Sequence, residues 1–506
     1  MSARRAGILL HPTSLPGRFG IGDLGPAARR FAGFLAAAGQ TLWQVLPLAP
    51  TGYGDSPYQG LGAFAGNPLL VSLEDLAADG LLDAADLASA PAFPAGAVDY
   101  GPVITWKTAL LRRAAERFDA GAAPALRRAF DDFRARAARW LDDFALFAAL
   151  KDRHGGLPWT RWPASLSRRE PVALARAREE LAPEVRAIEL SQFAFDRQWL
   201  ALRDHARGRG VGLVGDLPIY VAHDSSDVWA RPDLFQLDAR GEPAFVAGVP
   251  PDYFSATGQL WGNPLYRWEE QAEACHDFML ERLRAALAQV DLVRVDHFRG
   301  FEAYWAVPAG APTSQEGAWR PGPGAALFDH LQRELGPLPL IAENLGVITP
   351  EVEALRHRYG LPGMAILSFA FGKDPQAPGF RPHAYARDLV AYTGTHDNDT
   401  VVGWWRSEGG DSIRSEADVR EEKDLARRYL DLGDRPIHEA MIRALYASVA
   451  DTAIVPLQDV LGLGSEARMN RPATATGNWR WRFREEDMGA AQAAWLGELC
   501  GLYGRA

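Results

Sequence analysis

Short runs of apolar residues, bounded by Gly, Pro or Asp, recur along the chain between stretches with helical patterning. This order of elements is typical of buried parallel strands that are joined by helices. The clearest runs are residues 7–10, 41–46, 212–220, 292–295, 338–342, 365–371 and 389–392. We therefore predict an α/β fold, a (β/α)8 barrel that occupies residues 1–506 as a single domain.

Two stretches interrupt this pattern. Between residues 73 and 201 the strand-like runs give way to helical patterns, which predicts a helical insertion subdomain. Residues 222–291 are rich in Asp, Pro, Gly and aromatic residues, and we expect a second insertion subdomain here, over the mouth of the barrel. Residues 461–481 form a Gly/Asn/Trp loop before a terminal helix, so no C-terminal all-β domain is expected.

Polar side chains follow several of the apolar runs at their carboxyl ends. They are His11, Asp216, Asp296 with His297, Glu343 with Asn344, and residues 396–399. In a β/α barrel these strand ends meet at one face, and that face carries the chemistry. Carboxylates and histidines at strand after strand are harder to obtain by chance than the variable polar residues of scaffold loops. The sequence therefore predicts an acidic site at the barrel mouth.

Composition and charge narrow the possible partners. The net charge of -10 comes from Lys and Arg interspersed among Asp and Glu, which argues against nucleic acid as a partner. No stretch approaches the roughly 18 apolar residues that a membrane span needs. The only cysteines are Cys275 and Cys500, and the N-terminal apolar run is too short for a signal peptide, so we expect a cytoplasmic protein. The oligomeric state is left open.

The chain has no motif that predicts a cofactor or a metal. Gly210, Gly212 and Gly215 match the spacing G-x-G-x-x-G, but they lead into a strand, whereas a dinucleotide-binding loop follows one. The Asp clusters at 224–227 and 397–399 lack the spacing of a calcium loop. We expect neither a cofactor nor a metal.

The run that ends at Asp296 has the pattern of a catalytic strand. Side chains alternate along a strand, so Leu292, Arg294 and Asp296 are expected on one face and His297 on the other. A cation beside a carboxylate favours the ionised form that a nucleophile requires. The alternative is a purely structural Arg/Asp pair at a strand end.

Glu343 ends the next run and is a candidate general acid and base, provided that burial or nearby carboxylates raise its pKa. Retaining glycosidases need two carboxyl groups about 5 to 5.5 Å apart, which neighbouring strand ends can supply. Asp397, at a later strand end, can bind sugar hydroxyls as the ring distorts. His297 and His396 are expected to orient the same sugar, although each alone is more often a structural group.

The segments around these residues resemble glycoside hydrolase family 77, the amylomaltases and plant disproportionating enzymes of the α-amylase clan. Four of them resemble the signature regions of the clan: GDLPIYVAHDSSDVW (215–229), VRVDHFRG (293–300), IAENLG (341–346) and THDNDT (395–400). Four others are more specific to amylomaltases: HPTSLPGRFGIGDLG (11–25), WQVLPLAPTGYGDSPYQ (43–59), GVPPDYFSATGQLWGNPLY (248–266) and EARMNRPATATGNWRWR (466–482). The resemblance covers nearly the whole chain.

The resemblance implies 4-α-glucanotransferase activity and a role for each matching residue. Asp296 would be the nucleophile, Glu343 the acid and base, and Asp397 the carboxylate that stabilises the distorted sugar. The residues expected to bind substrate are Arg294, His297, His396, Asp216, Tyr58, Ser56, Asp252, Tyr253, Phe254, Gln259 and Trp261. The departures from the family pattern are at Ala49, Ala365, Ser368 and Ala473, and they concern subsite affinity and chain-length preference.

The family also implies the substrates, which are α-1,4-glucans and maltodextrins, with glucose as an acceptor. Transfer requires that water be kept from the glycosyl intermediate, and we expect the aromatic loop around Tyr253, Phe254 and Trp261 to lie over the site and do this. Trp43 lies inside an apolar strand, and we expect it in the core. Two alternatives stay open: an α-glucan hydrolase of the amylase type, and a non-catalytic barrel that only binds maltodextrin.

Overall fold

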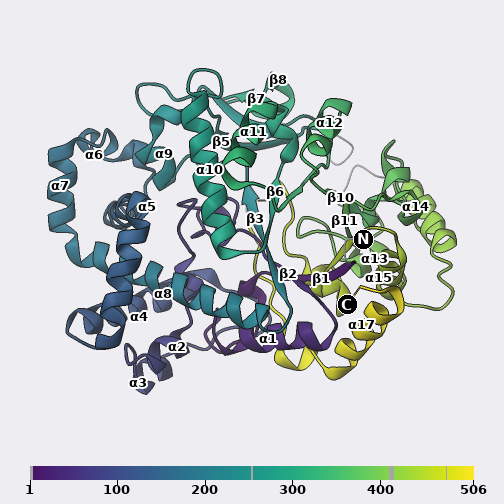
Figure 1. Ribbon diagram of the computed structural model, residues 1–506, viewed down its shortest axis with the longest axis horizontal. Coiled ribbons are helices and arrows are strands. Elements are labelled where there is room, and N and C mark those ends of the chain that lie inside the picture. Colours follow the sequence, from purple (N-terminus) through teal and green to yellow (C-terminus); the bar gives the residue numbers. More distant parts are fainter. Residues whose placement is uncertain (1–3, 252–254, 410–414, 475, 506) are drawn as a thin grey trace.

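The centre of the protein is a sheet of eight parallel strands (Figure 1), in a computed structural model that describes residues 4–251, 255–409, 415–474 and 476–505. In chain order the strands are β1 (Arg5–Leu9), β2 (Leu42–Gln44), β3 (Gly212–Pro218), β6 (Leu292–Asp296), β9 (Leu340–Ala342), β10 (Gly363–Ile366), β11 (Leu389–Tyr392) and β12 (Thr452–Pro456). Their order in the sheet is β10-β11-β12-β1-β2-β3-β6-β9.

Two hydrogen bonds join the outer strands of this order, β9 and β10. The amide of Ala342 donates to the carbonyl of Pro362 at 2.9 Å, and the amide of Met364 donates to the side-chain oxygen of Asn344 at 2.8 Å. These bonds bring the two ends of the sheet together, so the sheet is a nearly closed barrel and the predicted (β/α)8 fold is confirmed.

Each predicted apolar run overlaps one strand of the barrel, but the prediction missed two features. The run 365–371 was placed too late, because β10 ends at Ile366 and a 3-10 turn, Leu367–Phe369, follows it. The amide of Ser368 donates to the carbonyl of Thr393 at 3.0 Å, which draws the chain away from the strand direction. The eighth strand, β12, was not predicted, although all five of its residues are buried.

Helices surround the barrel. They are α1 (Pro26–Ala37), α9 (Ser226–Ala230), α10 (Ala272–Gln289), α11 (Gly324–Leu335), α12 (Pro350–Arg358), α13 (Val401–Arg406), α14 (Glu416–Tyr429), α15 (Ile437–Ala447), α16 (Leu457–Val460) and α17 (Ala490–Tyr503). Helix α1 starts with Pro26 in its first turn and stops before Gly39, whose φ of 65° is in the left-handed region that favours glycine. Between β10 and β11 three 3-10 turns stand in place of an α-helix.

Seven helices between β2 and β3 project to one side of the barrel, at the left of Figure 1. They are α2 (Leu73–Ala78), α3 (Ala84–Ala88), α4 (Tyr100–Asp119), α5 (Arg127–Arg153), α6 (Ala164–Ser167), α7 (Pro171–Glu180) and α8 (Ala182–Arg207). Phe118 of α4, Phe130 of α5 and Phe193 of α8 meet edge to face, with ring centroids 5.4 and 5.5 Å apart. Because α8 also packs on α1 and β3, this helical body is anchored to the barrel wall.

A second sheet of four antiparallel strands lies on the barrel. It consists of β5 (Gln259–Pro264), β4 (Phe245–Val249), β7 (Ala303–Pro308) and β8 (Ala318–Pro321), in that order. Two of its strands fall in the predicted insertion 222–291 and two come from the connection after β6. Helix α10, at the end of the same insertion, packs on β3 and β6 as a helix of the barrel wall does.

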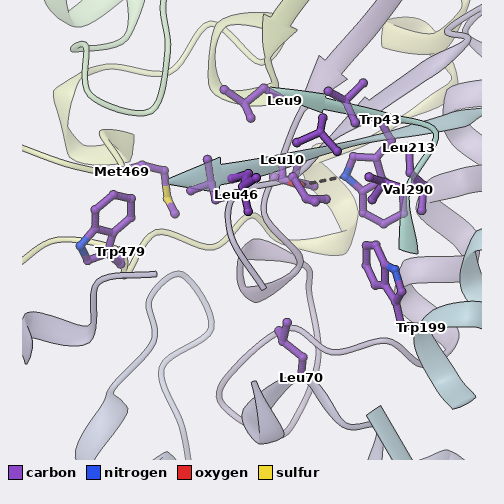
Figure 2. Packing of buried hydrophobic residues seen from close by; sticks show 14 of the residues in the cluster. Leu9, Leu10, Trp43, Leu46, Leu70, Trp199, Leu213, Val290, Met469 and Trp479 are labelled. Atoms are coloured by element: carbon purple, nitrogen blue, oxygen red, sulfur yellow. Dashed lines mark hydrogen bonds between the residues drawn. The ribbon is translucent and has the colours of Figure 1, made fainter. Parts of the chain in front are cut away.

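The core runs from the barrel into the surrounding helices. Trp43 is fully buried, as predicted, and its indole N–H donates to the carbonyl of Leu10 at 2.8 Å (Figure 2). The ring of Phe31, from α1, meets it edge to face at 4.9 Å. Burying such a large side chain contributes on the order of 2–3 kcal/mol, and the hydrogen bond avoids the cost of an unpaired indole N–H. Among the described residues, no helix is both long and apolar enough to cross a membrane.

Candidate active site

A cleft of about 690 Å³ opens at the carboxyl ends of the barrel strands. It is lined by ten of the predicted site residues: Ser56, Tyr58, Gln259, Trp261, Arg294, Asp296, His297, Glu343, His396 and Asp397. The three candidate catalytic carboxylates follow or end β6, β9 and β11, so strands that are far apart in sequence deliver them to one mouth. Asp252, Tyr253 and Phe254 lie outside the described residues.

Arg294 joins two carboxylates at the base of the cleft. Its Nη1 lies 2.8 Å from both oxygens of Asp216, and its Nη2 lies 2.9 Å from Oδ1 of Asp296. Burial works against the charge of the guanidinium, but the two carboxylates outweigh burial and raise the pKa of Arg294. Arg294 therefore stays charged and holds one oxygen of Asp296 in place.

Asp216 lies behind this pair and not on the cleft wall. Its side chain is fully buried, and besides Arg294 it accepts a hydrogen bond from the hydroxyl of Tyr58 at 2.8 Å. The ring of Tyr58 in turn stacks on His396, with centroids 5.0 Å apart and planes 19° apart. Asp216 thus acts on the cleft through Arg294 and Tyr58.

Glu343 is buried at the end of β9 and faces the Arg294/Asp296 pair. Its two oxygens accept hydrogen bonds from the amides of His297 and Leu345, both at 2.8 Å. Burial raises the pKa of Glu343 to about 7; the negative charge of Asp296 adds to the rise, while Arg294 and the two amides oppose it. Near neutral pH the carboxyl can both give and take a proton, which is the property expected of a general acid and base.

This raised pKa predicts a pH-dependent stability difference between the protein and Glu343→Gln. Between pH 4.5 and 7 the folded protein keeps a proton on Glu343 that the unfolded chain has released, so its stability falls as pH rises through this interval. The glutamine does not titrate. The difference in unfolding free energy, variant minus parent, should therefore rise by up to on the order of 3 kcal/mol from pH 5 to pH 8, because only the parent loses stability in this interval.

Urea unfolding of both proteins at several pH values measures this difference. A hydrogen bond lost in the variant shifts its stability equally at every pH, so the change with pH is the informative quantity. Glu334→Gln, at a surface ion pair with Arg284, is the matched control and should show no such trend. A difference between Glu343→Gln and the parent that stays constant from pH 5 to pH 8 would contradict the raised pKa.

His297 lines the cleft, and the alternation that placed it on the opposite face to Asp296 was wrong. Strand β6 ends at Asp296, and His297 adopts φ 53° and ψ 51°, which turns its ring back toward the mouth. The ring meets Trp261 edge to face at 4.8 Å. Burial lowers the pKa of His297 to about 4, so the imidazole is neutral at pH 7.

Asp397 is held by residues of the loop that follows α16. Its Oδ1 accepts a hydrogen bond from the side-chain amide of Asn470 at 2.7 Å and lies 3.3 Å from Nε2 of His396. Its main-chain carbonyl accepts from Arg468 at 2.8 Å. The carboxylate remains about half exposed, so these contacts orient it while leaving it open to a ligand.

Trp261 and Gln259 form one wall of the cleft from β5. The indole N–H of Trp261 donates to the side-chain oxygen of Gln259 at 3.2 Å. The amide group of Gln59 lies 3.4 Å from the carbonyl of Trp261, which ties this strand to the loop after β2. The wall thus combines an aromatic surface with amide groups, a combination that suits sugar rings and their hydroxyls.

Further residues line the cleft that were not singled out from the sequence. They are Tyr53, Arg299, Trp319, Arg468, Asn470 and Trp479, among others. Four of these six lie in the amylomaltase-like segments 43–59 and 466–482, and Arg299 lies in 293–300, so a signal was present but did not mark the individual residues. Trp319 lies outside all these segments.

The cleft has the groups for a double displacement at a sugar carbon. Asp296 is ion-paired and one-quarter exposed, whereas Glu343 is buried and its pKa is near neutrality. A pair of carboxyl groups whose environments differ in this way can divide the roles of nucleophile and acid/base.

Comparison with known proteins finds relatives that match along the whole chain. The sequence model of a family described as 4-alpha-glucanotransferase matches residues 10–487. A 4-alpha-glucanotransferase of Thermus thermophilus is 51% identical over 500 residues, which cover 97% of each chain, and one of Synechocystis is 48% identical over 508 residues, covering 100% of this chain and 99% of the relative. An amylomaltase from Streptococcus agalactiae, solved in complex with acarbose, superposes with a TM-score of 0.93 at 38% identity and covers 99% of this chain and 100% of its own.

Proposed function

This chain belongs to glycoside hydrolase family 77, the 4-alpha-glucanotransferases, and we propose that Asp296, Glu343 and Asp397 carry its reaction by a retaining double displacement. In the first step the carboxylate of Asp296 attacks the anomeric carbon of a donor glucan. The bond to the leaving glucan breaks, and Glu343 gives its proton to the leaving oxygen. A glycosyl group is then bound to Asp296 through an ester.

In the second step the acceptor glucan takes the place of the leaving glucan. Glu343, now ionised, takes the proton of the acceptor 4-hydroxyl as that oxygen attacks the anomeric carbon and displaces Asp296. Two inversions give net retention. The observation that carries this assignment is the contrast between the Arg294-paired Asp296 and the buried Glu343, whose pKa of about 7 allows both halves of the proton shuttle.

We propose that Asp397 and its neighbours bind the sugar ring as it distorts. A half-exposed carboxylate, oriented by Asn470 and His396, can accept hydrogen bonds from sugar hydroxyls that strengthen as the ring flattens. The neutral imidazole of His297 and the buried Arg294 supply donors on the neighbouring wall. Tyr58, Ser56, Gln259 and Trp261 are proposed to bind adjacent sugars.

The proposed substrates are α-1,4-glucans and maltodextrins, with glucose as an acceptor. The family membership and the acarbose complex of the Streptococcus agalactiae amylomaltase support this choice. We further propose a cytoplasmic location, because Cys275 and Cys500 are both buried free thiols. In this proposal residues 1–506 are one catalytic domain, which 73–201 and 222–291 enter as insertions.

Incubation with maltotriose alone tests the reaction type. We expect glucose together with maltodextrins longer than maltotriose, because the intermediate on Asp296 is passed to a second sugar chain. Chromatography of the products measures this. Equal amounts of glucose and maltose would instead indicate hydrolysis, and unchanged maltotriose would indicate a protein that only binds it.

A further inference from the structure

Asp459 is a buried carboxylate that does not line the cleft and takes no part in the reaction proposed above. It lies in α16, directly after β12, and only 1% of the residue is exposed. One of its oxygens accepts a hydrogen bond from the hydroxyl of Thr393 at 2.6 Å, and the other accepts one from the amide of Val401 at 2.7 Å. A carboxylate buried in this way is costly unless it is hydrogen-bonded, so both bonds fix their donors in place.

The two donors are the ends of the loop that carries Asp397. Thr393 is the first residue after β11, and Val401 is the first residue of α13. Asp397 lies midway, four residues from each of them. The two oxygens of a single carboxylate therefore close loop 393–401 at its base and set the separation of its ends.

Asp459 is charged when it makes these bonds near neutral pH. Burial raises the pKa of Asp459 to about 6; the bonds from Thr393 and Val401 oppose the rise, and the negative charge of Asp399 adds to it. At pH 7 most of the carboxylate is therefore ionised. Hydrogen bonds to an ionised acceptor are stronger than those between neutral groups, which favours a rigid base for the loop.

The middle of the loop is held by the segment that follows α16. The hydroxyl of Ser465 donates to the carboxylate of Asp399 at 2.7 Å, and the main-chain amide of Asn470 donates to the carbonyl of His396 at 3.0 Å. The bonds to the third carboxylate of the site, described above, come from the same stretch, residues 465–470. These contacts orient the middle of the loop, and the buried carboxylate of α16 fixes its two ends.

We propose that Asp459 is a positioning residue for glucan transfer: by holding both ends of loop 393–401, it places Asp397 against the sugar ring as the ring distorts. This inference rests on the proposed role of Asp397 and identifies the residue that keeps it in position. The bonds from sugar hydroxyls to Asp397 strengthen as the ring flattens, so a shift of the loop weakens binding in the transition state more than in the ground state. A misplacement of about 1 Å can cost about 100-fold in rate.

Asp459→Ala removes both bonds at the base of the loop. It should lower kcat for maltotriose by roughly 10- to 100-fold, while KM changes by less than about threefold. Fluoride release from α-maltotriosyl fluoride should fall by the same factor as maltotriose cleavage, because Asp397 contacts the sugar whatever group leaves. A displaced Glu343 would instead slow maltotriose cleavage more, since fluoride leaves without a proton.

Two further variants separate positioning from a loss of stability. Asp459→Asn can still accept from the amide of Val401 and can donate to the hydroxyl oxygen of Thr393, so its kcat should stay within roughly threefold of the parent. Asp86→Ala is the matched control: Asp86 is also a buried carboxylate that accepts a main-chain bond, from Asp83 at 2.9 Å, but it lies in α3, away from the cleft. The control should lower the melting temperature and leave kcat and KM unchanged.

A double-mutant cycle with Asp397→Asn decides whether Asp459 acts through Asp397. The activated donor α-maltotriosyl fluoride keeps fluoride release measurable in the slow variants. Added to Asp397→Asn, the change Asp459→Ala should lower kcat by less than about threefold, because the contact that Asp459 positions is already lost. In the parent background the same change should cost the full 10- to 100-fold, by the roughly 1 Å displacement argued above.

Each other outcome overturns the inference. Equal losses in the two backgrounds would mean that Asp459 acts independently of Asp397, and a parent-like kcat for Asp459→Ala would mean that it positions nothing. An Asp459→Asn variant as slow as Asp459→Ala would exclude the two hydrogen bonds as the cause. These three results leave glucan transfer intact, whereas a parent-like kcat for Asp397→Asn alone would overturn the proposed role of Asp397 and the inference with it.

Discussion

Asp296→Asn is expected to lower kcat for disproportionation of maltotriose by roughly 10⁴-fold or more, the scale seen when a covalent nucleophile is removed. The amide keeps the size of the carboxylate and one acceptor oxygen toward Arg294. It lacks the negative charge that attacks the anomeric carbon, so the ester intermediate cannot form. Glucose release sampled over several days measures a kcat this low.

Asp75→Asn provides the matched control for this loss. Asp75 also pairs with an arginine, Arg29, through contacts of 2.9 and 3.0 Å, but this pair lies away from the cleft. The control should keep the kcat of the parent. Turnover by Asp296→Asn within tenfold of the parent would mean that Asp296 and Arg294 are only a structural ion pair, the alternative that the sequence left open.

The local sequence pattern was enough to predict most of the barrel strands, because they are short apolar runs bounded by Gly, Pro or Asp. It failed at β12, whose apolar run, residues 453–455, is only three residues long, although Asp451 and Pro456 bound it in the same way as the predicted runs. It also missed the antiparallel sheet. β4 pairs with β7 across a stretch of chain that contains α10 and β6, and such a pairing leaves no trace in the spacing of nearby residues.

In the candidate site, too, contacts between residues close in sequence were predicted, whereas contacts that depend on the folded chain were not. The Arg294/Asp296 contact follows from two-residue spacing on one strand, and it was predicted for that reason. The orientation of His297 depends on a left-handed backbone conformation that residue types alone did not indicate. The contact between Asn470 and Asp397 joins segments 73 residues apart, so only the folded chain brings the two together.

Glu343→Gln is expected to lower kcat/KM for maltotriose by about 10² to 10⁴-fold, the usual contribution of general acid–base catalysis. Glutamine cannot protonate the leaving oxygen of a sugar, whereas fluoride leaves without a proton. Fluoride release from α-maltotriosyl fluoride should therefore fall much less than maltotriose cleavage. The ratio of the two losses is the quantity to measure, because a general distortion of the cleft would reduce both equally.

The pH profile of the parent enzyme gives the second half of this prediction. The acid form of Glu343 is needed to protonate the leaving glucan, and it is lost as pH rises through a pKa of about 7. kcat/KM for maltotriose should therefore fall above pH 7, while kcat/KM for the fluoride should not fall there, because its first step needs no proton. A decline above pH 7 that is the same for both donors would assign the titration to another group and remove Glu343 from the role of acid.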